Sequence, residues 1–353
     1  MPIPTRLRGT EQRRITANLK PRRRKAKQQP LRQGDTLPFS ARSTRSDILP
    51  TFNRPPSRAV APLPPRRPVD RALLDALEHA PLACFHRVHL KQPIQEGKDH
   101  FSQVWRVEVE AGASKHLAVL KLFVEALFPY PGTESRRIWQ RAQIFIDAEV
   151  DSYAAFSGLQ GSVIPYCYGA YNFALPFGET VPGILLEDLT DIAAPLPVWL
   201  ARRMEHKHRQ HRRRQLDDAG NNSDGSSIDS SDSDVDPEEE ILLELKDVQP
   251  VLNSIFNTLD HAHAAGRAHL NSDPDDLLVV GTSPSDAYTV TTGFATTCAA
   301  EERAEEIRQM YANRSGDELH YSWQSNGWSI LFGSVGTEVD YDLMHEFAAQ
   351  RGR

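Results

Sequence analysis

Two stretches of the chain carry side chains that could do chemistry. In VLKLF, Lys121 lies between Leu120 and Leu122. Neighbouring side chains of a strand point to opposite faces, so a strand here would turn the Lys121 ammonium away from its apolar neighbours. The other stretch is GRAHLNSDPDDLLVV, residues 266–280, which places an imidazole, an amide and several carboxylates before an apolar run.

The second stretch offers little general-base chemistry. An amide such as that of Asn271 cannot accept the proton of a substrate hydroxyl at neutral pH. The carboxylate of Asp276 could coordinate a cation, because oxygen ligands suit Mg²⁺. The run SDPDD is, however, also typical of a solvated turn in which Pro274 fixes the backbone. We favour the turn over an improvised metal site.

Hydrophobic spacing predicts the elements that would hold these side chains. RALLDALEHA has helical spacing, while FSQVWRVEVEA and KHLAVLKLFVEAL read as two strands joined by the turn EAGAS. A helix is predicted over residues 136–159, where apolar residues recur every three or four positions, and strands follow around VIPYCYGAYNF and VPGILLEDL. Together these elements predict a small α+β lobe.

The next ordered region begins near residue 241 with a predicted helix. Val251, Leu252 and Ile255 fall on one face of this helix, and Gly266 would end it. Strands around LLVVG and AYTVTTGFA follow, and then helices near AEEIRQMYANR and DYDLMHEFAAQ.

Uneven charge predicts two disordered segments. Residues 1–70 hold 17 Lys and Arg against 4 Asp and Glu, although the whole chain has a formal net charge of -6. This basic arm, residues 1–69, has too few apolar residues to offset the entropy of ordering. Residues 201–240 run from the basic RRMEHKHRQHRRRQ into an acidic, Ser-rich block and are predicted to be a disordered insertion.

Cysteine usage and hydropathy bear on the cellular compartment. Cys84, Cys167 and Cys298 are far apart and outside paired-ligand spacing, which argues against a disulfide framework or a zinc site. The chain has no apolar run long enough for a membrane span, and no apolar core of a secretory signal. We therefore expect an intracellular protein, cytoplasmic or nuclear, without membrane contact. KPRRRKAK is typical of a nuclear-import or nucleic-acid patch.

Six motifs follow one another in the order found in protein kinases. They are FSQVWRV, VLKLF, EVDSYAAFSGLQGSVIPYCYG, GILLEDL, HAAGRAHLNSDPDDLLVV and VTTGFAT. Together they resemble the protein kinase-like superfamily, and the third is similar to a group of fungal kinase-like proteins. The resemblance covers roughly residues 90–310. It implies an α+β, two-lobed protein kinase-like fold, with an N-terminal lobe and hinge at residues 70–200 and a reduced C-terminal lobe at 241–353.

The resemblance also implies a nucleotide site. Lys121 would pair with the phosphates and Glu149, in the following helix, would hold it, as in kinases. A plain surface lysine on an edge strand is the alternative. The full set of nucleotide contacts implied in this way is Gly97, Val104, Val119, Lys121, Glu187, Leu189 and Leu278.

The catalytic positions of the family are altered in this chain. His269 keeps its place, but Asn271 occupies the position of the catalytic Asp. Asp276 and Gly293 fall at the two metal-binding positions, and Gly293 has no side chain to hold magnesium. Phe294 is retained beside it. The substitutions remove the charge neutralisation and positioning on which phosphoryl transfer depends.

These departures predict a pseudokinase, a binding or scaffolding module with at most weak nucleotide binding. ATP is the cofactor to expect, magnesium support is not expected, and the protein partner is unknown. One alternative is a divergent active kinase that transfers the γ-phosphate of ATP to a protein or small molecule, which retention of Lys121 and Glu149 favours. Another is a nucleic-acid-associated protein whose basic arm contacts the polyanion.

Overall fold

The computed structural model describes twelve stretches of the chain. They are residues 9–41, 63–78, 86–96, 100–111, 114–129, 141–221, 245–264, 267–269, 276–281, 283, 286–294 and 297–299. The chain divides into two compact units. The first comprises Met1–Ile192, Asn257–Asn271 and Val290–Asn313, and the second comprises Ala193–Phe256, Ser272–Thr289 and Arg314–Arg353.

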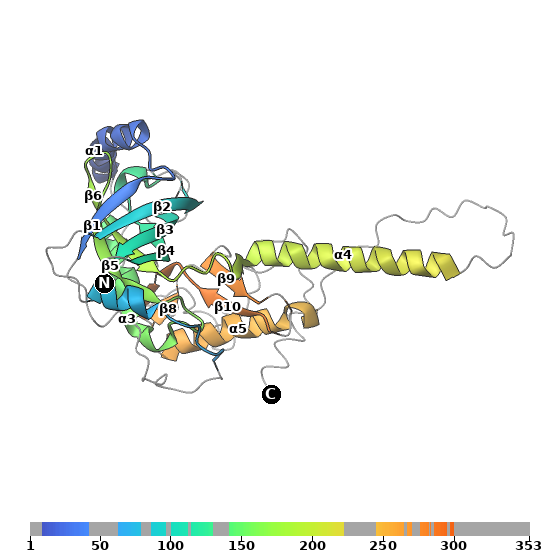
Figure 1. Ribbon diagram of the computed structural model, residues 1–353. Helices are drawn as coiled ribbons and strands as arrows, with labels where there is room; N and C mark the ends of the chain where they lie inside the picture. Colours follow the sequence, from blue (N-terminus) through green and yellow to red (C-terminus); the bar gives the residue numbers. More distant parts are fainter. Residues whose placement is uncertain are drawn as a thin grey trace, which may run out of the picture. The chain divides into compact units, whose positions relative to one another are not determined.

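A closed, six-stranded antiparallel barrel forms the centre of the first unit (Figure 1). Its strands are hydrogen-bonded in the order β1-β2-β3-β4-β6-β5. Their bounds are β1 Thr36–Ala41, β2 His86–Gln95, β3 Gln103–Ala111, β4 Ser114–Leu122, β5 Cys167–Ala174 and β6 Thr180–Leu186.

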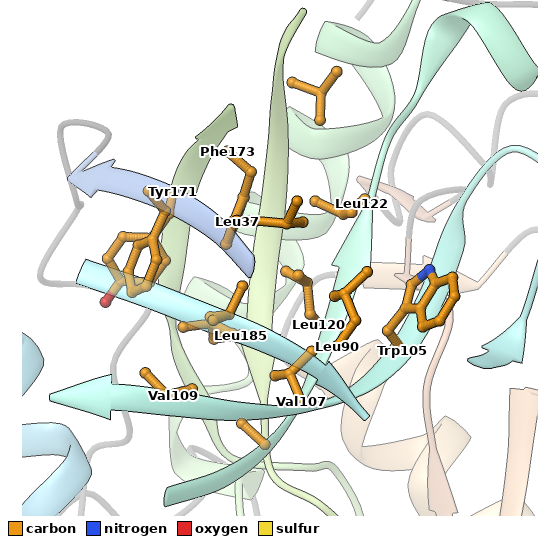
Figure 2. Close-up of a cluster of buried hydrophobic side chains, with 14 of the residues drawn as sticks. Leu37, Leu90, Trp105, Val107, Val109, Leu120, Leu122, Tyr171, Phe173 and Leu185 are labelled. Carbon is orange, nitrogen blue, oxygen red and sulfur yellow. The ribbon is translucent and has the colours of Figure 1, made fainter. Parts of the chain in front are cut away.

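Alternating side chains fill the barrel with an apolar core. On β3, Trp105, Val107 and Val109 are buried, whereas the polar residues between them are partly exposed, as expected for a strand with one face in the core. Leu120 and Leu122 of β4 join the same cluster and are fully buried. Figure 2 shows these side chains converging inside the barrel from several strands.

Strand β1 closes the barrel, and it comes from the arm that was expected to be disordered. It pairs antiparallel with β2 on one side and with β5 on the other. Leu37 and Phe39 alternate with exposed or partly exposed residues and are buried to 0% and 1% exposure in the core. Burial of these two side chains stabilises a segment whose composition alone argued against order.

Helix α1, Gly9–Gln28, also belongs to this arm and docks on the barrel unit. Leu19, Arg23 and Ala26 are buried. The Arg22 guanidinium donates to Glu125 and Glu179 at 2.8 Å, and Arg23 donates to the backbone carbonyl of Ala126 at 3.0 Å. Hydrogen bonds from arginine to carboxylate and carbonyl oxygen therefore fix the helix in place.

Two further helices belong to this unit. In α2, Arg71–Glu78, Leu73 and Leu74 join the barrel core, and the Asp70 carboxylate accepts a hydrogen bond from the Leu73 N–H at 2.9 Å, as at a helix N-terminus. Helix α3, Ala142–Ala155, builds a second apolar cluster together with Phe123 and Phe128. The short 3₁₀ turns η2, Glu125–Leu127, and η3, Ser157–Leu159, flank these elements, and β8, Arg267–His269, pairs with β11, Thr297–Ala299.

The second unit contains most of a small sheet, one long helix and the first part of another. The sheet has the order β10-β9-β7, with bounds Tyr288–Thr291, Leu277–Val280 and Ala193–Pro195. Helix α4 spans Leu196–Asn221 and buries Leu196, Trp199 and Leu200 near its start. Helix α5, Leu245–Ala264, buries Val251, Leu252 and Ile255, the face that the sequence predicted.

The expected two-lobed protein kinase-like fold with a reduced C-terminal lobe is wrong. The described residues form a mixed α+β structure with a closed six-stranded barrel and five helices instead of two kinase-like lobes. The predicted disorder is also wrong for residues 9–41 and for 201–221, since α1, β1 and α4 occupy them. The helices predicted near AEEIRQMYANR and DYDLMHEFAAQ, and residues 222–240, lie outside the described residues.

Candidate functional site

The candidate site is built around an ion pair between β4 and α3. The Lys121 Nζ lies 2.8 Å from the Glu149 Oε1. Lys121 points away from the core that contains Leu120 and Leu122, because successive side chains of β4 alternate. Its ammonium also lies 5.5 Å from the centre of the Phe123 ring, within the range of a cation–π contact. Val104 is its cross-strand neighbour on β3.

Burial gives this ion pair its chemical character. Glu149 is fully buried and Lys121 is 8% exposed. Each charge has lost most of its hydration, so removing either one would leave the other without compensation. The second carboxylate oxygen, Oε2 of Glu149, accepts no hydrogen bond from any described residue. A lysine ammonium has three donors and gives one to Glu149, so two remain for another acceptor.

Glu187, an expected nucleotide contact, is instead held by Arg67. The Arg67 guanidinium donates to both Glu187 carboxylate oxygens at 2.8 Å. The same carboxylate accepts the Tyr166 N–H at 3.0 Å, and the Tyr166 hydroxyl donates to the Arg67 carbonyl at 2.8 Å. Both side chains of the ion pair are at most 10% exposed. This geometry gives the Glu187 carboxylate a structural role.

The remaining expected nucleotide contacts are dispersed. Val119, on β4, pairs with Leu186 and is partly exposed, while Leu189 is buried. Leu278 is partly exposed on β9, which belongs to the second unit. Gly97 lies outside the described residues. Within the first unit, the structure therefore brings together Lys121, Glu149 and Val104.

The altered catalytic positions are only partly described. His269 lies on β8, opposite Thr297 of β11, whereas Asn271 falls outside the described residues. Gly293 has a φ of 78°, in the left-handed region that glycine adopts readily and aspartate seldom does. The backbone thus gives a local reason for glycine at this position. Asp276 is partly exposed and belongs to the second unit.

Phe294, beside Gly293, anchors its segment on α3 and the residues after it. Its ring lies 5.3 Å from that of Tyr153 in an edge-to-face arrangement, and 5.2 Å from that of Phe156. Phe294 is 2% exposed. Aromatic packing of this kind stabilises the segment beyond simple area burial.

Arg67 and the two α1 arginines are the structural residues that sequence reasoning missed. Arg67 lies in LPPRRPVD, whose prolines and charges indicate a linker. Leu19 and Ala26, seven residues apart on α1, form too sparse an apolar pattern to stand out among cations. The alternation of Leu37 and Phe39 was the one usable signal of order in the arm.

Burial also raises the pKa values of three groups on β5. It raises the pKa of the Cys167 thiol on β5 to about 12, so this thiol stays neutral in the folded protein. It likewise raises the pKa of Tyr168 and of Tyr171. Because thiolate is the reactive form, Cys167 has the character of an inert core residue.

Among the residues that the structure describes, no group of three or more His, Cys, Asp or Glu side chains is arranged to hold a metal ion. In the same part of the chain, no helix is both long and apolar enough to cross a membrane.

The chain matches no protein-family model and no curated protein. Any functional conclusion therefore rests on the residues and geometry described above.

Proposed function

We propose that this chain is a non-catalytic binding or scaffolding module of the pseudokinase type, which holds ATP weakly through Lys121. The observation that supports the proposal is the buried ion pair of Lys121 with Glu149. Glu149 orients the ammonium, and the remaining donors of Lys121 would bind a phosphate oxygen. Such a module works inside the cell, in the cytoplasm or nucleus, with a protein partner.

The catalytic positions support binding without phosphoryl transfer. Asn271 cannot remove a proton from an acceptor hydroxyl, and general-base catalysis contributes about 10²- to 10⁴-fold to rates. Gly293 supplies no carboxylate for magnesium, and its positive φ disfavours aspartate there. Without a metal ligand at Gly293, nucleotide affinity depends little on Mg²⁺.

A thermal-shift titration with ATP, with and without Mg²⁺ or Mn²⁺, tests this proposal. A ligand that binds only the folded state raises stability by about 2.7 kcal/mol at 100 times its Kd. We expect a shift that is the same with and without metal. Lys121→Arg, which keeps the charge, should reduce the shift, and Lys115→Arg on the barrel surface should leave it unchanged.

The alternative is a divergent kinase that transfers the γ-phosphate of ATP. It predicts a thermal shift that requires metal, together with labelled phosphate on a protein or small-molecule acceptor. Absence of any thermal shift at millimolar ATP would eliminate both the ATP-binding module and the kinase. The remaining function would be a scaffold that binds no nucleotide.

A second candidate function, contact with a polyanion through the basic arm, is favoured by α1. Its docked face holds Leu19, Arg23 and Ala26, and the opposite face carries exposed cations at helical spacing. These cations are Arg13, Arg14, Lys20, Arg24, Lys25 and Lys27. No described residue forms an ion pair with any of them.

Salt dependence tests this second candidate. Cationic contacts with phosphates release counterions, so affinity should fall with added salt. The triple variant R13Q/K20Q/R24Q should lower the affinity for polyphosphate and flatten its salt dependence. Unchanged binding in this variant would reject the α1 face as the contact.

A further inference from the structure

The later part of α4 is a cationic helix with little apolar surface. Residues 202–214, called the cationic segment from here on, carry seven Arg and Lys against one acidic residue, Glu205. Each of these residues is exposed or partly exposed, whereas Leu196, Trp199 and Leu200, which dock the helix, precede them. Figure 1 labels this helix α4. The segment is therefore helical and accessible within the second unit.

The positive charges surround the helix axis. At 3.6 residues per turn, Arg212, Arg213 and Arg214 point about 100° apart, to three different sides. Arg202 and Arg209 lie on the side of Arg213. Among the described residues, none forms an ion pair with Arg212, Arg213 or Arg214, and Glu205 approaches Arg209 only at 3.4 Å on an exposed surface.

Like charges at this spacing repel one another. Arg209 and Arg213 are four residues apart on one side, a placement that disfavours an isolated helix when the charges are equal. A partner with negative charge on several sides would relieve the repulsion. This requirement limits the kinds of polyanion that could bind the cationic segment.

Three kinds of polyanion differ in how they could meet such a helix. A flat acidic protein surface contacts one face only, so cations on the other sides would remain unused. An anionic membrane needs an apolar face to lie in the interface, and Met204 is the one aliphatic side chain of the cationic segment. The major groove of B-form DNA is about 12 Å wide, admits a helix of about 10–12 Å diameter, and has phosphates along both walls.

We propose that the cationic segment binds double-stranded DNA by lying in its major groove, with arginines from opposite sides of the helix contacting the two phosphate backbones. The segment is about 20 Å long at 1.5 Å per residue, so it would follow several base pairs. Duplex RNA is a poorer fit, because its major groove is deep and narrow. Phosphate contacts carry little sequence information, so binding is largely independent of sequence.

Fluorescence anisotropy of a labelled 20-base-pair DNA duplex, titrated with the full chain between 50 and 200 mM NaCl, tests the proposal. Each phosphate contact contributes about -0.9 to the slope of log affinity against log salt. With four to six contacts we expect a slope of about -4 to -5. Duplex RNA and polyglutamate, used as competing polyanions, should displace the labelled DNA only at much higher concentrations than unlabelled duplex DNA.

Three single variants, R212Q, R213Q and R214Q, probe three sides of the helix without changing its propensity much. Each should weaken binding several-fold at 50 mM NaCl and reduce the magnitude of the slope by about one. The double variant K91Q/K115Q removes two exposed cations from the barrel surface and should have no effect. Circular dichroism should show unchanged helix content in all four variants.

Several results would overturn the groove assignment. An effect confined to one of the three arginines would mean that a single face docks. Equal displacement by polyglutamate or duplex RNA would mean a general polyanion contact, and no binding at 50 mM NaCl would reject the site altogether. Loss of binding in R13Q/K20Q/R24Q alone would transfer the function to α1.

Discussion

At the scale of single residues, the Lys121–Glu149 ion pair depends on both of its partners. Glu149 is fully buried, so the hydration that its charge loses is replaced chiefly by Lys121. Buried pairs of this kind are costly to break from one side, whereas apolar side chains of similar size can often replace both partners together.

Lys121→Met should therefore lower the free energy of unfolding by about 3–5 kcal/mol. The double variant K121M/E149L should be clearly more stable than K121M, because it also removes the uncompensated carboxylate. Urea denaturation of the purified variants measures both quantities. Lys115→Met, at an exposed ion pair on the same strand, is the matched control and should unfold like the wild type. An equal loss of unfolding free energy in K121M and in the double variant would contradict this account.

Sequence patterns located some of these residues better than others. Strand alternation placed Lys121 on the face opposite its two leucine neighbours, whereas the resemblance to kinases gave Glu149 as its partner, and the two side chains meet at 2.8 Å. Arg67 could not be found in this way, since its role depends on a carboxylate 120 positions away. Whether a charged residue of a proline-rich segment is buried depends on tertiary contacts that local patterns do not contain.

At the scale of elements, β1 closes the barrel, because it pairs with β2 along one edge and with β5 along the other. The strand is six residues long and pairs along both of its edges. Its sequence signal is short, because Leu37 and Phe39 are its two large core side chains. Strands β3, β4 and β6 could be predicted from their regular alternation or apolar runs, but a six-residue strand inside a cationic, proline-rich arm was outweighed by overall composition.

Phe39→Ala should lower the free energy of unfolding by about 3–5 kcal/mol, the usual range for a fully buried aromatic side chain. Its ring contacts those of Tyr171 and Phe173 at centroid distances of 5.0 and 5.2 Å, so truncation leaves a cavity between β1 and β5. Ser40 is the next residue and is partly exposed, so Ser40→Ala should change the free energy of unfolding little. Denaturant unfolding of the two variants checks this prediction, and similar stability for both would mean that β1 is not part of the folded core.

At the scale of the whole molecule, buried acids make stability depend on alkaline pH. The pKa of Cys167 is raised to about 12 by burial, and burial also raises the pKa of Tyr171. Above the pKa of an exposed thiol, the unfolded chain loses a proton that the folded chain retains. The folded state then binds more protons, so the free energy of unfolding falls as the pH rises toward 12.

Cys167→Ala should remove one of these contributions. Between pH 9 and 11, the wild type should lose stability faster than the variant, by up to about 1.4 kcal/mol per pH unit. Urea unfolding at half-unit pH steps measures the difference. Parallel pH profiles for the two proteins would show that Cys167 titrates normally and is not buried as described.

Composition correctly indicates uneven charge, but the disorder that it predicts is wrong for residues 9–41 and 201–221. Much of the positive charge lies on two helices, α1 and α4. Composition favours disorder in both, but α1 gains order from Arg22, Arg23 and two buried apolar residues. The N-terminal part of α4 gains it from Trp199 and its neighbours. A few anchoring contacts thus outweighed a segment's average hydropathy.

Isothermal titration of ATP into the full chain in the absence of divalent metal tests the central claim most directly. The account predicts saturable binding of one ATP per chain, weakened in Lys121→Arg and unchanged by added Mg²⁺, with no transfer of the γ-phosphate during the experiment. Absence of binding at millimolar ATP, or binding that is the same in wild type and Lys121→Arg, would contradict it.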